Sequence, residues 1–182
     1  FSSKRFWQLR WKPVVASTEL ELSNWLKETP IKHNFPRACL ASRQTHGTGQ
    51  RGRLWQSPKG GVWISAAFPL SASRKSAGLI GLAVALVLAQ RLEKLSIPVR
   101  IKWPNDLIIN KRKLAGFLPK IVYRGGAMTM GRIGIGLNVS NRVPIEGISL
   151  NQALWPRKFN ADRWSAEVLF ALDIALDLIE SN

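Results

Sequence analysis

Residues 102–116 read KWPNDLIINKRKLAG, a segment in which two short apolar runs flank a polar turn. Leu107 to Ile109 and the run that begins at Leu114 have the length and composition of strands. Asn110-Lys111-Arg112 between them is typical of a hairpin turn, and Pro104 favours another turn just before the first strand. The stretch therefore predicts antiparallel strands with polar side chains gathered at one end.

The neighbouring segments continue this pattern of hairpins. Further strands are expected at Val99 to Lys102, at Leu114 to Val122 and at Met128 to Val139, the last two joined by the turn Arg124-Gly125-Gly126. Toward the N-terminus, strands are expected at residues about 5 to 15, at Arg37 to Arg43, and from Gly61 to Leu70, ending at Ser71. Successive hairpins of this kind favour a largely antiparallel sheet.

Helices are expected in three places. Ser17 or Thr18 can cap a helix with the apolar face Leu22, Trp25 and Leu26, which Pro30 closes. Residues 75 to 95 are apolar on nearly all sides and predict a buried helix. Asn160 or Asp162 can cap a last helix with an apolar face from Trp164 to Ile179. The predicted fold class is α+β, a mixed, largely antiparallel sheet backed by helices.

Composition favours one domain over residues 1–182. The chain has 182 residues, 46% of them hydrophobic, and shows no repeat or linker. Cys39 is the only cysteine, which favours a reducing, cytoplasmic location and a small buried side chain. The longest apolar run, Ala77 to Ala89, is too short to span a membrane, so no membrane partner is expected. Because Phe1 is not an initiator methionine, we expect the numbering to begin inside a longer chain.

The chain is strongly basic, with 27 Lys and Arg against 11 Asp and Glu and a formal net charge of +16. Such a field attracts phosphates, acidic proteins, nucleic acid or anionic lipid. The basic residues are scattered and never form a block of roughly five, and no RNA-binding motif is present. We therefore expect no specific nucleic-acid partner, although a nucleic-acid-binding module stays open as a hypothesis.

A glycine-rich segment, residues 47–52 (GTGQRG), matches the dinucleotide-binding pattern G-x-G-x-x-G. The residues that follow, RLWQSPKGG, form a loop and cannot open the helix that holds a pyrophosphate in such folds. What remains is a loop whose N–H groups can face an anion, with cations at Arg51 and Arg53 and a base-stacking ring at Trp55. The alternative is a surface loop with incidental glycines.

Polar side chains also gather at the hairpin of residues 102–116. Lys102, Asn105, Asp106 and Lys113 bring an amide, a carboxylate and two ammonium groups to one end of the sheet. Together they could hold Mg²⁺ and the phosphate oxygens of a nucleotide. Alone, Pro-Asn-Asp is also an ordinary turn.

Taken together, the motifs resemble the catalytic domain of biotin protein ligases in order and spacing over most of the chain. The matching segments are Gln44-Thr45, Gly47-x-Gly49-x-x-Gly52-x-x-Trp55, Ser57-Pro58-x-Gly60-Gly61, Lys102-Trp103-Pro104-Asn105-Asp106, Lys113-Leu114-Ala115-Gly116 and Gly134-Ile135-Gly136-Leu137-Asn138.

This resemblance implies a fold like that of class II aminoacyl-tRNA synthetases and biotin ligases, with biotin, ATP and Mg²⁺ as ligands. Such enzymes join the biotin carboxylate to the α-phosphate of ATP. They then pass biotin from biotinyl-5′-AMP to a lysine of the biotin carboxyl carrier protein, a subunit of acetyl-CoA carboxylase. A homodimer formed through the sheet edge is a further possibility.

The resemblance also implies site residues, position by position. Those expected to bind biotin are Ser17, Thr18, Gln44, Gly47, Thr48, Gly49 and Gly116. Those expected to bind the nucleotide are Gln50, Arg51, Trp55, Asn105, Lys113 and Asn138. Those expected to be catalytic are Lys113, Arg51, Arg53 and Asp106, with Asp106 also a candidate metal ligand. Simpler roles compete: Ser17 as a helix cap, Gln44 as the closure of the loop neck, and Trp103 as a core residue.

Four positions depart from the family pattern. Thr48 and Gln50 stand where arginines are usual, Glu19 where an asparagine is usual and Lys120 where an acid is common. We expect neither an N-terminal DNA-binding domain nor a C-terminal SH3-like barrel, and therefore no repressor activity. The alternatives to an active ligase are a catalytically weakened biotin- or acceptor-binding homologue and a lipoate or octanoyl ligase relative.

Overall fold

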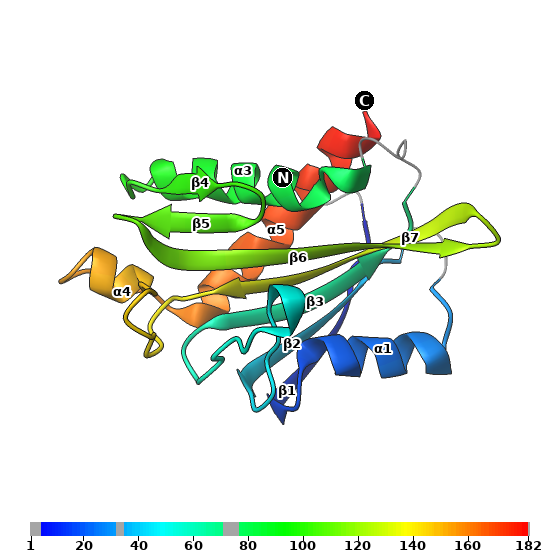
Figure 1. Ribbon diagram of the computed structural model, residues 1–182, viewed down its shortest axis with the longest axis horizontal. Helices are drawn as coiled ribbons and strands as arrows, with labels where there is room; N and C mark the ends of the chain where they lie inside the picture. Colours follow the sequence, from blue (N-terminus) through cyan, green and yellow to red (C-terminus); the bar gives the residue numbers. More distant parts are fainter. Residues whose placement is uncertain (1–4, 32–34, 71–76, 182) are drawn as a thin grey trace.

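One mixed sheet of seven strands organises the chain in the computed structural model, which describes residues 5–31, 35–70 and 77–181 (Figure 1). The strand order is β1-β2-β3-β7-β6-β5-β4. The strands are β1 (Gln8–Val15), β2 (Arg37–Gln44), β3 (Val62–Phe68), β4 (Arg100–Lys102), β5 (Asp106–Ile109), β6 (Arg112–Arg124) and β7 (Ala127–Leu137). Only β1 and β2 are parallel among these neighbouring pairs, so the sheet is largely antiparallel, as predicted.

Helices cover both faces of this sheet. The longer ones are α1 (Thr18–Glu28), α3 (Ile80–Glu93) and α5 (Ala161–Glu180); α4 (Leu150–Ala153) and the 3-10 turn η1 (Gln50–Gly52) are short. Ala66 of β3 belongs to the large core that includes α3 and α5, whereas Ala67 packs with Leu22 and Trp25 of α1. Because successive strand residues face opposite sides, α1 lies on the face away from α3 and α5.

The predicted elements are confirmed, with shifted ends. The first strand begins at Gln8, and the buried helix is described from Ile80 to Glu93; predicted residues 75, 76 and Ser71 lie outside the described residues. Ser17 caps α1, since its hydroxyl accepts a hydrogen bond from the Leu20 N–H at 3.1 Å. The sequence interpretation missed α4, a single turn that opens with a capping box formed by Ser149 and Gln152.

One core assignment was wrong. Trp103, expected in the core, is 79% exposed. It follows the last residue of β4, and β4 and β5 end the strand order. Because no described strand lies beyond this edge, the turn that carries Trp103 projects from the packed layers. Within the described ranges, no helix has the length and apolar content needed to cross a membrane.

Cys39 lies on β2 with only 3% of its surface exposed, and burial raises the pKa of its thiol to about 11. Since the thiolate is the reactive form, we expect no reaction of the folded protein with a disulfide reagent at pH 8 and rapid reaction in denaturant. The ordinary pKa of a cysteine thiol is 9.0, so the folded state should bind more protons than the unfolded state between about pH 9 and 11 and lose stability there as pH rises. Rapid labelling of the native protein at pH 8 would contradict this burial.

Candidate functional site

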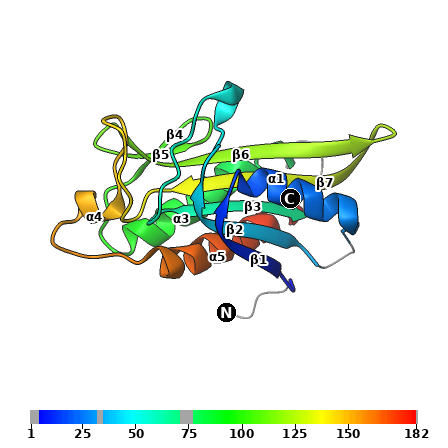
Figure 2. The same ribbon diagram turned by 90° about the horizontal axis from the view of Figure 1, so that it is seen from below.

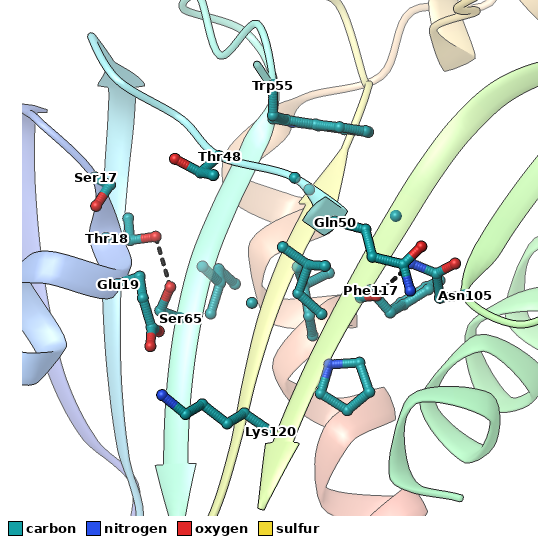
Figure 3. A pocket seen from close by; sticks show the side chains of 18 of the residues that line it. Ser17, Thr18, Glu19, Thr48, Gln50, Trp55, Ser65, Asn105, Phe117 and Lys120 are labelled. Atoms are coloured by element: carbon teal, nitrogen blue, oxygen red, sulfur yellow. Dashed lines mark hydrogen bonds between the residues drawn. The ribbon is translucent and has the colours of Figure 1, made fainter. Parts of the chain in front are cut away.

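Two adjoining cavities, of about 460 and 450 Å³, open on the face of the sheet away from α3 and α5. Figure 2 shows the loop that carries η1 projecting on this side. The first cavity, drawn in Figure 3, reaches α1 and the strands β3, β7 and β6, and the second lies toward residues 144–147. Residues that line both are Gly49, Gln50, Trp55, Asn105 and Lys113. These residues form the boundary at which two ligands could meet.

The glycine-rich loop is a small hairpin closed at its neck. The Gln44 N–H donates to the Ser57 carbonyl at 2.9 Å, and the Gly49 N–H donates to the Arg53 carbonyl at 2.7 Å. At the tip, Arg51 adopts φ of 58° and Gly52 φ of 75°, in the left-handed region that suits a tight turn. This loop contributes Thr48, Gly49, Gln50, Arg51 and Arg53 to the lining of the cavities.

The Trp55 indole lies flat against the sheet at a place where two glycines leave no side chains. Gly116 of β6 and Gly136 of β7 are direct partners in the sheet, and both face the indole. A Cβ atom added to Gly136 would come within 2.6–2.8 Å of three indole atoms. Real Cβ atoms do not approach so closely, so this glycine is what allows the ring to rest on the sheet. The indole N–H is buried and finds no acceptor within the described segments.

Lys113 stands between Trp55 and Asp106. Its ammonium nitrogen is 2.7 Å from the Asp106 carboxylate and 4.9 Å from the centroid of the Trp55 ring. Its backbone is fixed as well, because its N–H donates to the Glu146 carbonyl at 2.7 Å and its carbonyl accepts from the Ile148 N–H at 2.9 Å. An ammonium group at the junction of two cavities suits a negative charge that develops there.

Two asparagines complete the junction. The Asn105 amide donates to the Phe117 carbonyl at 2.9 Å, which ties the turn after β4 to β6. Asn138 donates to the Lys113 carbonyl at 3.3 Å and accepts from the Asn141 amide at 2.9 Å. Both amides therefore brace the strands that carry Lys113 while they line the cavities.

Hydroxyl groups gather at the α1 end of the first cavity. The Gln44 side-chain oxygen accepts from the Thr18 N–H at 2.7 Å and from the Thr18 hydroxyl at 3.0 Å. The Thr18 and Ser65 oxygens are 2.8 Å apart, and the Gln44 amide donates to Ser57 at 2.8 Å. This end can therefore contact a polar ring, whereas the junction at Lys113 can contact anions.

Known proteins share both the sequence pattern and the architecture of this chain. The pattern of the biotin/lipoate A/B protein ligase family matches residues 13–138, more than half of the chain. The chain belongs to this family. Of the curated relatives, the bifunctional ligase/repressor BirA of Escherichia coli (strain K12) is 37% identical over 177 residues, which cover 93% of this chain and 54% of that protein. The chain thus spans about half the length of that relative.

Solved structures of the family share the architecture. The biotin protein ligase from Aquifex aeolicus in complex with biotin and ATP superposes with a TM-score of 0.71 at 28% identity, covering 96% of this chain and 72% of that one. The Leishmania major biotin protein ligase in complex with biotinyl-5-AMP gives 0.74 at 22% identity over 95% and 76% of the two chains. At that lower identity the likeness supports the fold alone. The predicted fold class is confirmed.

Within this ligase-family site, the structure gathers nearly all the predicted residues. The first cavity is lined by Ser17, Thr18, Gln44, Thr48, Gly49, Gln50, Arg51, Trp55, Asn105, Lys113 and Gly116. The second is lined by Gly49, Gln50, Arg53, Trp55, Asn105, Asp106, Lys113 and Asn138. Gly47 lines neither; its missing side chain makes room for the Trp55 carbonyl and the Ser57 hydroxyl, at 2.4 and 2.5 Å from an added Cβ. Its predicted contact with biotin stays a prediction.

Other lining residues escaped the sequence interpretation. Ser65, only 2% exposed, and Glu146 were not singled out, while Glu19 and Lys120 were noted only as departures from the family pattern. A serine inside the apolar run VWISAAF carries no signal of its own. Ser65 reaches the cavity because the register of β3 places it beside Thr18 of α1.

The predicted metal site has few protein ligands. Among the residues that the structure describes, no group of three or more His, Cys, Asp or Glu could hold a metal ion. The second cavity does hold the Asp106 carboxylate beside Asn105, and these are oxygen ligands of the kind Mg²⁺ takes. Such a set suits an ion that arrives with nucleotide phosphates and keeps most of its ligands from them.

Proposed function

We propose that the chain is a biotin protein ligase domain that forms biotinyl-5′-AMP from biotin and ATP and transfers the biotinyl group to a lysine of the biotin carboxyl carrier protein. The observation that carries this proposal is the position of Lys113, whose side chain stands where the two cavities join. Biotin in the first cavity would bring its carboxylate to this amine from one side. The nucleotide in the second would bring its α-phosphate from the other.

In the first step, a carboxylate oxygen attacks the α-phosphorus, the bond to the bridging oxygen breaks and pyrophosphate leaves. The phosphorus gathers negative charge in the transition state, and Lys113 together with loop N–H groups would neutralise it. In the second step, the acceptor amine attacks the carbonyl carbon, AMP leaves with the bonding electrons and one proton is released. Both steps need the two ligands held in contact, which adjoining cavities provide.

Asp106 would have two roles in this reaction. In the described structure its carboxylate holds the Lys113 ammonium at 2.7 Å, which keeps the amine aimed at the junction. With nucleotide present, Asp106 and Asn105 are the residues that would hold Mg²⁺. The ion would supply further neutralisation of phosphate charge.

Incubation with ATP, Mg²⁺ and biotin tests the proposal. We expect pyrophosphate release and biotinyl-adenylate in the absence of acceptor, followed by labelling of one lysine when a carrier domain is added. Calorimetry with lipoate in place of biotin should show much weaker binding. Biotin binding without adenylate at high enzyme concentration would instead support the catalytically weakened homologue, and preferred binding of lipoate the lipoate ligase relative.

Gln50 offers a further test, because it lines both cavities and its side chain points toward Asn105 (Figure 3). An amide donates hydrogen bonds but carries no charge, so contact with the adenylate phosphate should be weaker than that of an arginine. We expect Gln50→Arg to slow release of biotinyl-adenylate by roughly tenfold, given the gain of a charge-assisted hydrogen bond. Dissociation of radiolabelled adenylate, followed by rapid filtration, measures this.

Gln90→Arg is the matched control for this variant. It adds the same charge at an exposed position of α3, which lines neither cavity. Equal release rates for wild type and Gln50→Arg would remove the role assigned to position 50. Equal slowing by Gln50→Arg and Gln90→Arg would point to net charge instead.

The acceptor, the homodimer and the cytoplasmic location belong to the same proposal. β1 ends the strand order, and an edge strand can pair with another chain through its outer N–H and C=O groups. A second copy or a strand of the acceptor could use this edge. The single cysteine of the sequence, buried in β2, is compatible with a reducing compartment.

A further inference from the structure

The hydroxyl groups at the α1 end of the first cavity form a chain whose direction can be determined. The Thr18 backbone N–H can only donate, so the Gln44 side-chain atom at 2.7 Å must be the amide oxygen. The Gln44 amide nitrogen then faces Ser57 at 2.8 Å, and the Ser57 hydroxyl gives its hydrogen to the Trp55 carbonyl at 3.1 Å. The Thr18 N–H at one end and the Trp55 carbonyl at the other therefore determine which atom donates and which accepts in each hydrogen bond between them.

This direction decides what Ser65 can do. The Thr18 hydroxyl uses its only hydrogen on the Gln44 oxygen at 3.0 Å. In the 2.8 Å contact between the Thr18 and Ser65 oxygens, Ser65 must therefore be the donor. With its hydrogen committed to Thr18, the Ser65 oxygen has acceptor capacity only.

That oxygen faces the cavity. Ser65 lines it, and its partner across the β3–β7 ladder is Gly134, which has no side chain to cover it. A Cβ added at Gly134 would lie 3.9 Å from the Ser65 oxygen, so the absence of that carbon leaves the approach open. Figure 3 shows the Thr18–Ser65 hydrogen bond at the wall of the cavity.

We propose that Ser65 determines which ring the first cavity accepts, by taking a hydrogen bond from a ring N–H of the acid. A cyclic urea offers such donors. A dithiolane ring or a plain acyl chain offers none and would leave a buried acceptor unpaired, which costs more than the bond itself gains. This inference rests on the proposed function, because it assumes that the acid occupies the first cavity.

Isothermal titration with biotin and two analogues, in which one or the other ureido N–H is replaced by CH₂, tests this assignment. We expect the wild type to bind at least one analogue roughly tenfold more weakly than biotin, the loss of one hydrogen bond to a buried acceptor. In Ser65→Ala the ratio for that analogue should fall to about one. Ser65→Cys, of similar size and with a weaker acceptor, should give the same trend if the alanine variant folds poorly.

Ser57→Ala is the matched control, since it removes a hydroxyl from the same chain at a residue that lines neither cavity. It should keep the wild-type ratio, because the Thr18 N–H still fixes the Gln44 oxygen. If Ser65→Ala weakens biotin and both analogues equally, Ser65 has only a structural role and the inference fails while the proposed function stands. If the wild type binds no biotin, the proposed function fails and the inference falls with it.

Discussion

Replacing Lys113 by alanine should abolish adenylate formation, lowering its rate by roughly 10²- to 10³-fold or more, the loss expected for one preorganised donor at a developing negative charge. The ammonium of Lys113 is the cation fixed at the boundary of the two cavities, 2.7 Å from Asp106. The measurement is pyrophosphate release with biotin and ATP in the absence of acceptor. Because biotin itself would still fit the first cavity, its binding should fall far less than the rate.

Lys111→Ala is the matched control. Lys111 is exposed, sits in the β5–β6 turn two residues away and lines neither cavity, so the same loss of charge there should leave adenylate formation intact. Lys113→Ala also leaves the Asp106 carboxylate without its partner, so thermal unfolding of the variant must be compared with that of Lys113→Ala/Asp106→Asn. Wild-type rates in a folded Lys113→Ala protein would show that the role assigned to this residue is wrong.

Gly136→Ala should destabilise the protein by about 1–3 kcal/mol and disorder the boundary of the cavities. The added carbon would stand 2.6–2.8 Å from the Trp55 indole, so the ring must leave the floor formed by Gly116 and Gly136. Denaturant unfolding measures the change in stability. Adenylate formation should fall as well, because the ring also contacts Lys113.

Gly134→Ala provides the comparison within the same strand. A Cβ at Gly134 would meet its nearest neighbour, Leu118, at 3.6 Å, an ordinary contact, so little stability should be lost. Adding Trp55→Ala to Gly136→Ala should remove most of the cost specific to position 136, as a double-mutant cycle would show. Equal destabilisation by the two glycine substitutions would mean that the indole does not account for the requirement at position 136.

The fold was largely predictable because its signals are local. Turn residues such as Asn110 and Gly125 mark the hairpins, and the helix cap at Ser17 marks the start of α1. α4 was missed because a single turn is too short to show a helical period. Trp103 was misplaced because a tryptophan between apolar strands resembles a core residue until the strand order puts β4 at the edge.

The site was predictable to the extent that its residues belong to motifs. Lys113, Asp106 and the glycine-rich loop stand in recognisable runs, and the fold brings them together. Ser65 could not be found this way, since its exposure to the cavity depends on Gly134 in another strand and its polarity on Thr18 in a helix. The predicted stacking of Trp55 near adenine stays a prediction. The structure adds that the position of the indole depends on Gly136, against which the ring packs.

The boundary at Trp55 also bears on how such a protein can change over time. Thr18 and Ser65 contact only the first cavity, whereas Pro144, Glu146 and Gly147 contact only the second. On the proposed function, a mutation on one side of the indole would alter the choice of acid without touching the groups that would surround the nucleotide. The two preferences would then be separable traits, which selection or an engineer would modify one at a time while the proposed chemistry at the junction is kept.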